Sequence, residues 1–446
     1  MAQPLDSLTT ALLKAAKSAG ADAADAIAVD GSSISIDVLN GKLEHAERSE
    51  GVDIGLRVMI GQRQACVSAS DTSADTIETI AKRAVAMAQV APKDDSITQA
   101  EPAQLATGWD ADALELFDPT PEPDPATLQE NARRAEAAAM NVSGISQVQS
   151  ASSGYGQRRI HLATSNGFSG GYGRSSISTS CVAITGSGSD MERDYYGDGR
   201  IFAADMETPE YIGEMAAQRT IERANPRKSK SGAYPVLYDE RISGSLMGHL
   251  LAAINGTSIV RGSSWLRDAM GEQILPTTMS LIEDPLRLRT SSSRPFDGEG
   301  LASTKREIIK DGMLTGWTLD LSTAQKLGLQ STGNASRGTS APPSPSAGNI
   351  ALTQGPKSRN DLLVDMGTGL LVTSMIGSSI NATTGDYSRG ASGFWVENGE
   401  IQYPVNECTI AGNLRDMLAT LIPANDARKH LSRVVPSLLV EGLILA

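Results

Sequence analysis

The apolar positions near the start of the chain repeat with the period of a helix. In residues 5–19 the leucines fall on one face, and Asp6 can cap the first turn. The same period returns in residues 74–90, where Met87 is among the residues expected on the buried side. The pattern therefore predicts two amphipathic helices in the first ninety residues.

Between these helices the pattern changes to strict alternation. Residues 34–38 and 52–58 place an apolar side chain at every second position, as a half-buried strand does. Asn40-Gly41 lies between them and is the strongest short hairpin signal, because both residues tolerate the positive φ that a tight turn needs. We predict an antiparallel sheet packed against the two helices.

Helical and strand-like stretches alternate again further along the chain. An acidic, proline-bearing connector over 100–125 precedes an alanine-rich helix and several short strands, and a helix at 208–224 leads into a polar, basic hinge at 226–232. The predicted divisions are an N-terminal α+β domain over 1–115, a central α+β segment over 116–226 and a C-terminal β-rich domain over 233–446.

The last division opens with a strand at Tyr234–Tyr238 and a helix at about 241–254. After that, turn residues are frequent and apolar runs are short, and the proline- and serine-rich stretch Thr339–Asn349 is typical of a loop. This pattern favours a mainly antiparallel, barrel-like β domain over a Rossmann arrangement. The predicted fold class is α+β.

Charge and cysteine content limit the functions to consider. The 446 residues carry a net charge of −13, which disfavours nucleic-acid binding because the phosphate backbone is also negative. Cys66, Cys181 and Cys408 are widely spaced and form no CxxC pair, which fits a reducing compartment. We find no apolar run long enough to span a membrane and no secretory leader, so a cytoplasmic location is expected.

Several long runs of residues resemble the TldD/PmbA family, and within it the PmbA (TldE) branch. The resemblance extends over nearly the full chain and is strongest after residue 233. The runs that carry it are Ser293–Gly300, Lys310–Gly312, Ser331–Arg337, Gly385–Phe394, Glu397–Glu400, Tyr403–Val405, Thr409–Leu414 and Pro436–Gly442.

The resemblance also identifies where a zinc motif would lie. The TldD branch carries HExxxH on a helix, where the histidines bind zinc and the glutamate activates water. The matching positions here are Gly244, Ser245 and His249. Glycine offers no ligand and serine cannot act as the carboxylate base, so we assign no catalytic residue and no metal ligand to this chain.

Two other arrangements of these residues are weaker. A rebuilt metal site from His249, Cys408 and His430 has no support from spacing. Ser245 and His249 are four residues apart, but a serine hydrolase also needs an orienting group and an oxyanion hole, and no G-x-S-x-G motif is present. His45 and His161 lie in strand-like polar contexts and are expected at the surface.

The resemblance implies the non-zinc subunit of a heteromeric metallopeptidase that acts on unfolded or leader peptides. No cofactor is expected in this chain, and zinc is expected in a TldD-like partner. A homodimer is the other assembly that the resemblance leaves open. The alternative function is a regulatory binding protein, of the DNA gyrase modulator type, without a peptidase role.

Overall fold

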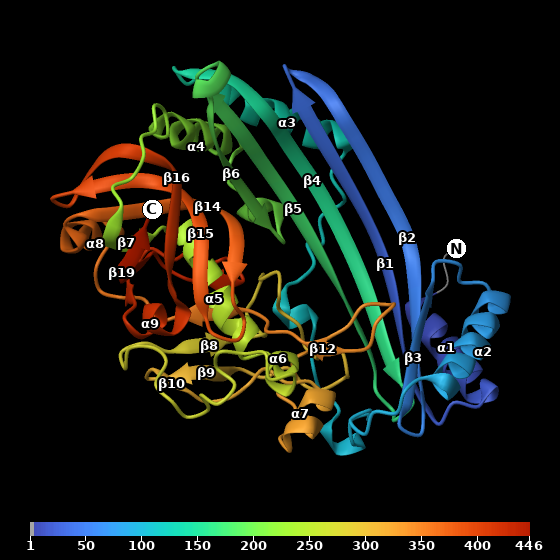
Figure 1. Ribbon diagram of the computed structural model, residues 1–446. Coiled ribbons are helices and arrows are strands. Elements are labelled where there is room, and N and C mark those ends of the chain that lie inside the picture. Colours follow the sequence, from blue (N-terminus) through green and yellow to red (C-terminus); the bar gives the residue numbers. More distant parts are fainter. Residues whose placement is uncertain (1–3) are drawn as a thin grey trace.

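The computed structural model describes residues 4–446. Six antiparallel strands form one long, curved sheet in the order β3-β2-β1-β4-β5-β6, and the C-terminal part of the chain lies on one side of it (Figure 1). The strands of this sheet are β1 (Ala23–Leu39), β2 (Lys42–Ile60), β3 (Arg63–Ala69), β4 (Ile145–Thr164), β5 (Ser169–Thr185) and β6 (Glu192–Arg200).

The predicted Asn40-Gly41 hairpin is confirmed. Leu39 pairs with Lys42, and the two turn residues have φ values of 54° and 72°. Beyond that hairpin, β1 also pairs with β4 along most of its length, from Asp25 opposite Thr164 onward. Strands from the first and second predicted divisions therefore belong to one sheet.

Helices cover this sheet in two places. Helices α1 (Leu5–Ala19) and α2 (Ala74–Val90) pack over β1, β2 and β3, while α3 (Pro125–Met140) and α4 (Pro209–Glu222) cover the other end of the sheet (Figure 1). The connector between α2 and α3 contains the short 3-10 helices η1 (Pro102–Gln104) and η2 (Asp112–Leu114), and η3 (Gly188–Asp190) and η4 (Ala203–Asp205) flank β6.

Two details of the predicted helices are wrong. Pro4 occupies the N-cap of α1, and Asp6 lies inside the first turn, where its carboxylate accepts from the Ser7 amide at 2.8 Å. Met87 is 42% exposed. It lies on the flank of α2 because the buried face is formed by small residues such as Ala84 and Ala88, four positions apart.

The C-terminal part contains a closed barrel, which confirms the predicted barrel-like architecture. Five strands follow the order β16-β15-β14-β7-β19, and pairing of β16 with β19 closes the ring. All neighbours are antiparallel except β14 and β7. The barrel strands are β7 (Gly232–Tyr238), β14 (Gly369–Ile380), β15 (Asp386–Glu397), β16 (Glu400–Asn413) and β19 (Leu438–Leu445), and β17 (Ile422–Pro423) pairs with β19.

A second, smaller sheet lies beside the barrel in the order β10-β9-β8-β13-β18. Its strands are β8 (Leu281–Glu283), β9 (Arg306–Lys310), β10 (Met313–Leu314), β13 (Ile350–Leu352) and β18 (Arg433–Val434). The predicted loop Thr339–Asn349 is irregular except for β12 (Ser344–Pro345), which pairs with β11 (Ala335–Ser336). The remaining helices are α5 (Glu240–Ala253), α6 (Gly256–Val260), α7 (Leu321–Leu327), α8 (Arg359–Met366) and α9 (Leu414–Ala419).

One apolar cluster joins the barrel, the smaller sheet and α5. Leu246, Met247 and Leu250 of α5 are fully buried in it, together with Trp395 from β15. Full burial of such a side chain stabilises the fold by roughly 1.5–3 kcal/mol, so this cluster fixes the helix that carries the motif positions. Within residues 4–446, none of the helices has the length and apolarity that crossing a membrane requires.

Candidate functional site

Helix α5 carries the positions that the zinc motif would occupy. Asp239 caps the helix, and its side chain accepts from the Arg241 amide at 3.2 Å. Arg241 also contacts Asp194 of β6 at 3.1 Å between the guanidinium and the carboxylate. The start of α5 is therefore attached to the N-terminal sheet as well as to the barrel core.

The motif positions lie on the less buried side of α5. Gly244, Ser245 and His249 are all partly buried, whereas Leu246 and Leu250 face the core. A Cβ atom added at Gly244 would have no other atom within 4 Å. There is space for a side chain at this position, but glycine has none to fill it.

His249 and Ser245 each hold a buried polar atom that has no hydrogen-bond partner among residues 4–446. These atoms are Nε2 of His249 and the Ser245 hydroxyl. The edge of the Tyr387 ring lies against the imidazole, with the centroids 5.9 Å apart. Burial, and then the positive charge of Arg389, lowers the pKa of His249 below its usual value, which favours the neutral ring at pH 7. Neutral imidazole can bind a metal, but a metal site needs further ligands.

The residues around His249 do not fit a zinc site. Among residues 4–446, no three His, Cys, Asp or Glu side chains are gathered as metal ligands. Cys408 is buried in β16 within the barrel core, as expected for a packing residue, and its thiol contacts the Thr409 carbonyl at 3.7 Å. His430 instead lies 3.8 Å from the Asp198 carboxylate on β6. The structure does not bring His249, Cys408 and His430 together, and we derive no step through a metal in this chain.

The serine hydrolase arrangement also lacks the hydrogen bond between the nucleophile and its base. A nucleophile and its base should be within hydrogen-bond reach of each other. Neither Ser245 Oγ nor His249 Nε2 has such a partner in the part of the chain that the structure describes.

The prediction for the remaining histidines is half right. His45 is 59% exposed at its side chain. His161 is not a simple surface residue, because its Nδ1 is 2.8 Å from the Thr9 hydroxyl of α1, and burial lowers its pKa. The polar sequence around His161 gave no indication that α1 packs over this part of β4.

A group of buried charges between the sheet and the C-terminal part escaped the sequence analysis. Asp25 of β1 accepts from Arg57 of β2 at 2.6 Å and also pairs with Arg337. The side chains of all three are at most 7% exposed. Burial lowers the pKa of Arg337 to about 9. We call Asp25, Arg57 and Arg337 the buried ionic triad.

Two carboxyl groups lie close to this triad. Asp297 accepts backbone amides from Glu299, Leu301 and Ala335 at 2.9–3.0 Å, and burial nevertheless raises its pKa. Glu299 accepts the Leu321 amide at 2.9 Å, and burial, followed by the charge of Asp297, raises its pKa to about 8. Glu299 therefore holds a proton at neutral pH.

Three of these charged residues lie in two of the runs that carry the family resemblance. Asp297 and Glu299 lie in Ser293–Gly300, and Arg337 ends Ser331–Arg337. Their clustering depends on β1 and β2, more than two hundred residues earlier in the chain. The only sequence signal was the presence of charged residues inside long family-specific runs.

Models of one family match most of the chain. The PmbA/TldA metallopeptidase domain 1 matches residues 24–88, the central domain of that family matches 118–224, and its C-terminal domain matches 231–446. The runs that carry the sequence resemblance after residue 233 fall inside the third match.

Two curated relatives resemble the chain over almost its full length. One is the metalloprotease PmbA of Escherichia coli O157:H7, which is 39% identical over 94% of this chain and 90% of its own length. The other is a metalloprotease PmbA homolog of Haemophilus influenzae, which is 36% identical over 97% of this chain and 93% of its own length.

Solved structures share the fold. A candidate modulator of DNA gyrase from Bacteroides thetaiotaomicron superposes with a TM-score of 0.91 at 25% identity, over 99% of this chain and 98% of that chain. TldE from Thermococcus kodakarensis superposes with a TM-score of 0.84 at 21% identity, over 98% of this chain and 100% of that chain.

Proposed function

Because the chain belongs to the PmbA/TldD metallopeptidase family, we propose that it is the subunit of a two-protein peptidase that does not carry the zinc. The observation that supports this most is the composition of the motif face of α5. Gly244 and Ser245 stand where a ligand and a base would be needed, and within residues 4–446 His249 belongs to no group of three His, Cys, Asp or Glu side chains that could hold a metal. The zinc and the attacking water would be supplied by a TldD-like partner.

In the proposed pair, this chain helps to form the chamber in which the substrate lies, and it holds the substrate there. The N-terminal sheet ends in two edge strands, β3 and β6. An extended peptide can pair its backbone with an edge strand, a mode that reads little sequence and excludes folded proteins, which offer no free strand. We propose unfolded peptides and leader segments as the substrate class.

Reconstitution tests the proposal. This chain and a TldD-like protein from the same genome are purified separately, and cleavage of an unfolded casein-like substrate is measured for each and for the mixture. We expect hydrolysis by the mixture and none by this chain alone. Hydrolysis by this chain alone, lost in His249→Ala and kept in His45→Ala, would overturn the proposal.

The same experiment addresses the regulatory alternative, which the name of the Bacteroides structure raises. A regulator of the gyrase modulator type would leave peptide cleavage unchanged whether or not it is present. It would also show no association with the TldD-like protein in gel filtration. Both results together would remove the peptidase subunit role.

A further inference from the structure

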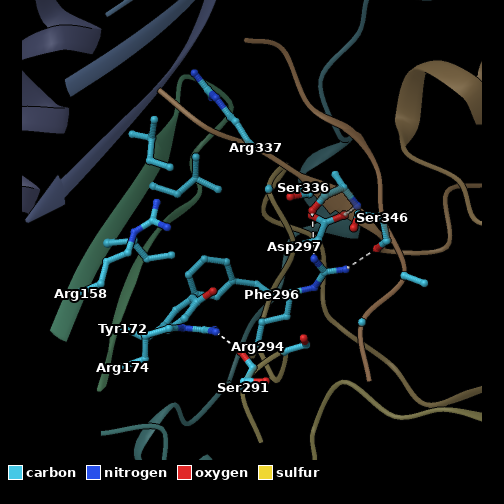
Figure 2. Close-up of a pocket in the computed structure, with 18 residues that line it drawn as sticks. Arg158, Tyr172, Arg174, Ser291, Arg294, Phe296, Asp297, Ser336, Arg337 and Ser346 are labelled. Carbon is cyan, nitrogen blue, oxygen red and sulfur yellow. Dashed lines mark hydrogen bonds between the residues drawn. The ribbon is translucent and has the colours of Figure 1, made fainter. Parts of the chain in front are cut away.

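A cavity of about 300 Å³ lies between the N-terminal sheet and loops of the C-terminal part (Figure 2). Strands β4 and β5 form one wall, and segments from Ser291–Gly298, Ala335–Arg337 and Ser346–Gly348 form the other. A second cavity of about 630 Å³ shares Arg158, Arg174 and Ser291 with the first. Because these three residues line both cavities, the cavities adjoin, and we call the smaller one the narrow end and the larger one the wider end.

Positive charge dominates the narrow end. Arg158, Arg174, Arg294 and Arg337 line it, with Asp297 as the only acidic lining residue among those the structure describes. The Asp297 carboxylate accepts hydrogen bonds from three backbone amides and forms no ion pair within 4.0 Å in residues 4–446. In a chain with a net charge of −13, this concentration of guanidinium groups is unusual.

Three of these guanidinium groups, Arg158, Arg174 and Arg294, form no ion pair within 4.0 Å in residues 4–446, although the charge of Arg294 acts on Asp297. Arg174 donates to the Ser293 carbonyl at 2.8 Å and to the Ser291 carbonyl, and Arg294 donates to the Ser346 carbonyl at 3.2 Å (Figure 2). Carbonyl oxygens orient a guanidinium but do not neutralise it. In the part of the chain that the structure describes, Arg158 is exposed and has no ion-pair partner, and the Arg294 Nε is buried without a hydrogen-bond partner.

Apolar side chains line the same cavity beside the arginines. Ile160 and Leu162 follow Arg158 at every second position of β4, and Phe296 lies two residues after Arg294. The Tyr172 ring meets Phe296 edge to face, with the centroids 5.5 Å apart. A ligand that fills this space must present an anionic group to the arginines and an apolar group to the neighbouring apolar side chains.

We propose that the narrow end binds the free carboxylate of a peptide whose last residue is apolar, and that the preceding residues follow the wider end. Arginine suits this role because its planar fork can donate two parallel hydrogen bonds to one carboxylate. An inorganic anion alone would leave the apolar lining residues Ile160, Leu162 and Phe296 uncovered. This inference rests on the proposed peptidase function, since it names how the substrate or its product is held.

Binding of labelled peptides to the purified chain tests the inference without a partner or catalysis. Fluorescence anisotropy is measured with Ala-Ala-Ala-Leu as the free acid and as the C-terminal amide, each labelled at its N-terminus. We expect the free acid to bind at least about tenfold more tightly, a difference of about 1.4 kcal/mol. Equal affinity of acid and amide would overturn the inference.

Variants on one strand locate the site. Arg158→Gln should weaken binding of the free acid about tenfold, because the residue lines the cavity and no other side chain depends on it for an ion pair. Arg159→Gln is the matched control: it is the next residue of β4, equally exposed, and its guanidinium lies 5.6 Å from the Phe117 ring instead. Arg294→Gln should also weaken binding, with urea unfolding used to check that it folds. Unchanged affinity in Arg158→Gln and Arg294→Gln would refute the assignment.

Inorganic phosphate separates a simple anion site from a peptide site. We expect millimolar phosphate to compete weakly with the free acid. Phosphate binding without any peptide binding would overturn the inference. This failure is distinguishable from failure of the proposed function, because peptide cleavage by the reconstituted pair is measured separately.

Discussion

The motif face of α5 and the buried ionic triad differ in how their buried polar groups are paired. On α5, Gly244 leaves open space and His249 keeps a buried ring nitrogen without a partner. At the triad, Asp25 joins two guanidinium groups that are almost completely removed from solvent. The comparison shows that the chain pairs its buried charges where its two parts meet and leaves polar atoms unpaired on α5. Arg337, which ends the run Ser331–Arg337, connects the C-terminal part to the N-terminal sheet through Asp25.

The largest expected effect comes from breaking the triad. Asp25→Ala should lower the free energy of unfolding by about 3–5 kcal/mol, because Arg57 and Arg337 would then be buried without a shared carboxylate. Urea denaturation measures the change. The control is Asp53→Ala on β2, where an exposed carboxylate accepts from the Ser70 hydroxyl, and a loss below about 1 kcal/mol is expected there. Equal losses in the two variants would contradict the importance given to the triad.

A smaller effect concerns the pH dependence of stability near the triad. The folded-state pKa of Glu299, about 8, lies above its ordinary value of 4.5, so the folded protein binds a proton that the unfolded chain releases between these values. The stability contributed by this group is complete below pH 4.5 and is lost as pH rises through 8. Glu299→Gln should therefore flatten the fall in the unfolding free energy between pH 5 and about 8.

The measurement is the urea midpoint at several pH values. Glu307→Gln serves as the control, since Glu307 pairs with Lys310 at a solvent-exposed position of β9. A fall in Glu299→Gln as steep as in the unaltered protein would show that the carboxyl is ionised in the folded state over this pH range.

The smallest expected effect is on α5. Gly244→His should change the free energy of unfolding by no more than about 1 kcal/mol, because an added Cβ meets open space and glycine is itself unfavourable inside a helix by about that amount. Gly256→Ala is the contrasting variant, since its added Cβ would lie 2.6–2.8 Å from Thr323 and Leu319 side-chain atoms. Thermal unfolding of both variants provides the test. A loss at Gly244 as large as at Gly256 would show that the motif face has no room for a ligand.

Local sequence patterns predicted the local elements well. The Asn40-Gly41 turn, helix α2 and helix α5 depend on neighbouring residues, so periodicity and turn chemistry were sufficient. The pairing of β1 with β4 and the closure of the barrel by β16 and β19 connect distant residues, and no local pattern encodes them. Frequent turns and short apolar runs predicted a barrel-like domain, but not which strands close it.

The site was predictable to a different degree. The prediction that Gly244 and Ser245 supply neither a zinc ligand nor a base rests on residue type alone, once the family motif is aligned with the helix. The four arginines that line the narrow end come from four separate segments, so only the folded chain shows that they meet. His161 was misplaced for the same reason, because its partner Thr9 lies on a different element.

The central claim is that α5 of this chain cannot support zinc chemistry by itself. Its most direct test is the zinc content of the purified chain, measured by elemental analysis after expression in zinc-supplemented medium and dialysis against a buffer without a chelator. The account predicts far less than one zinc per chain, with no difference between the unaltered protein and His249→Ala. One zinc per chain that is lost in His249→Ala would contradict it.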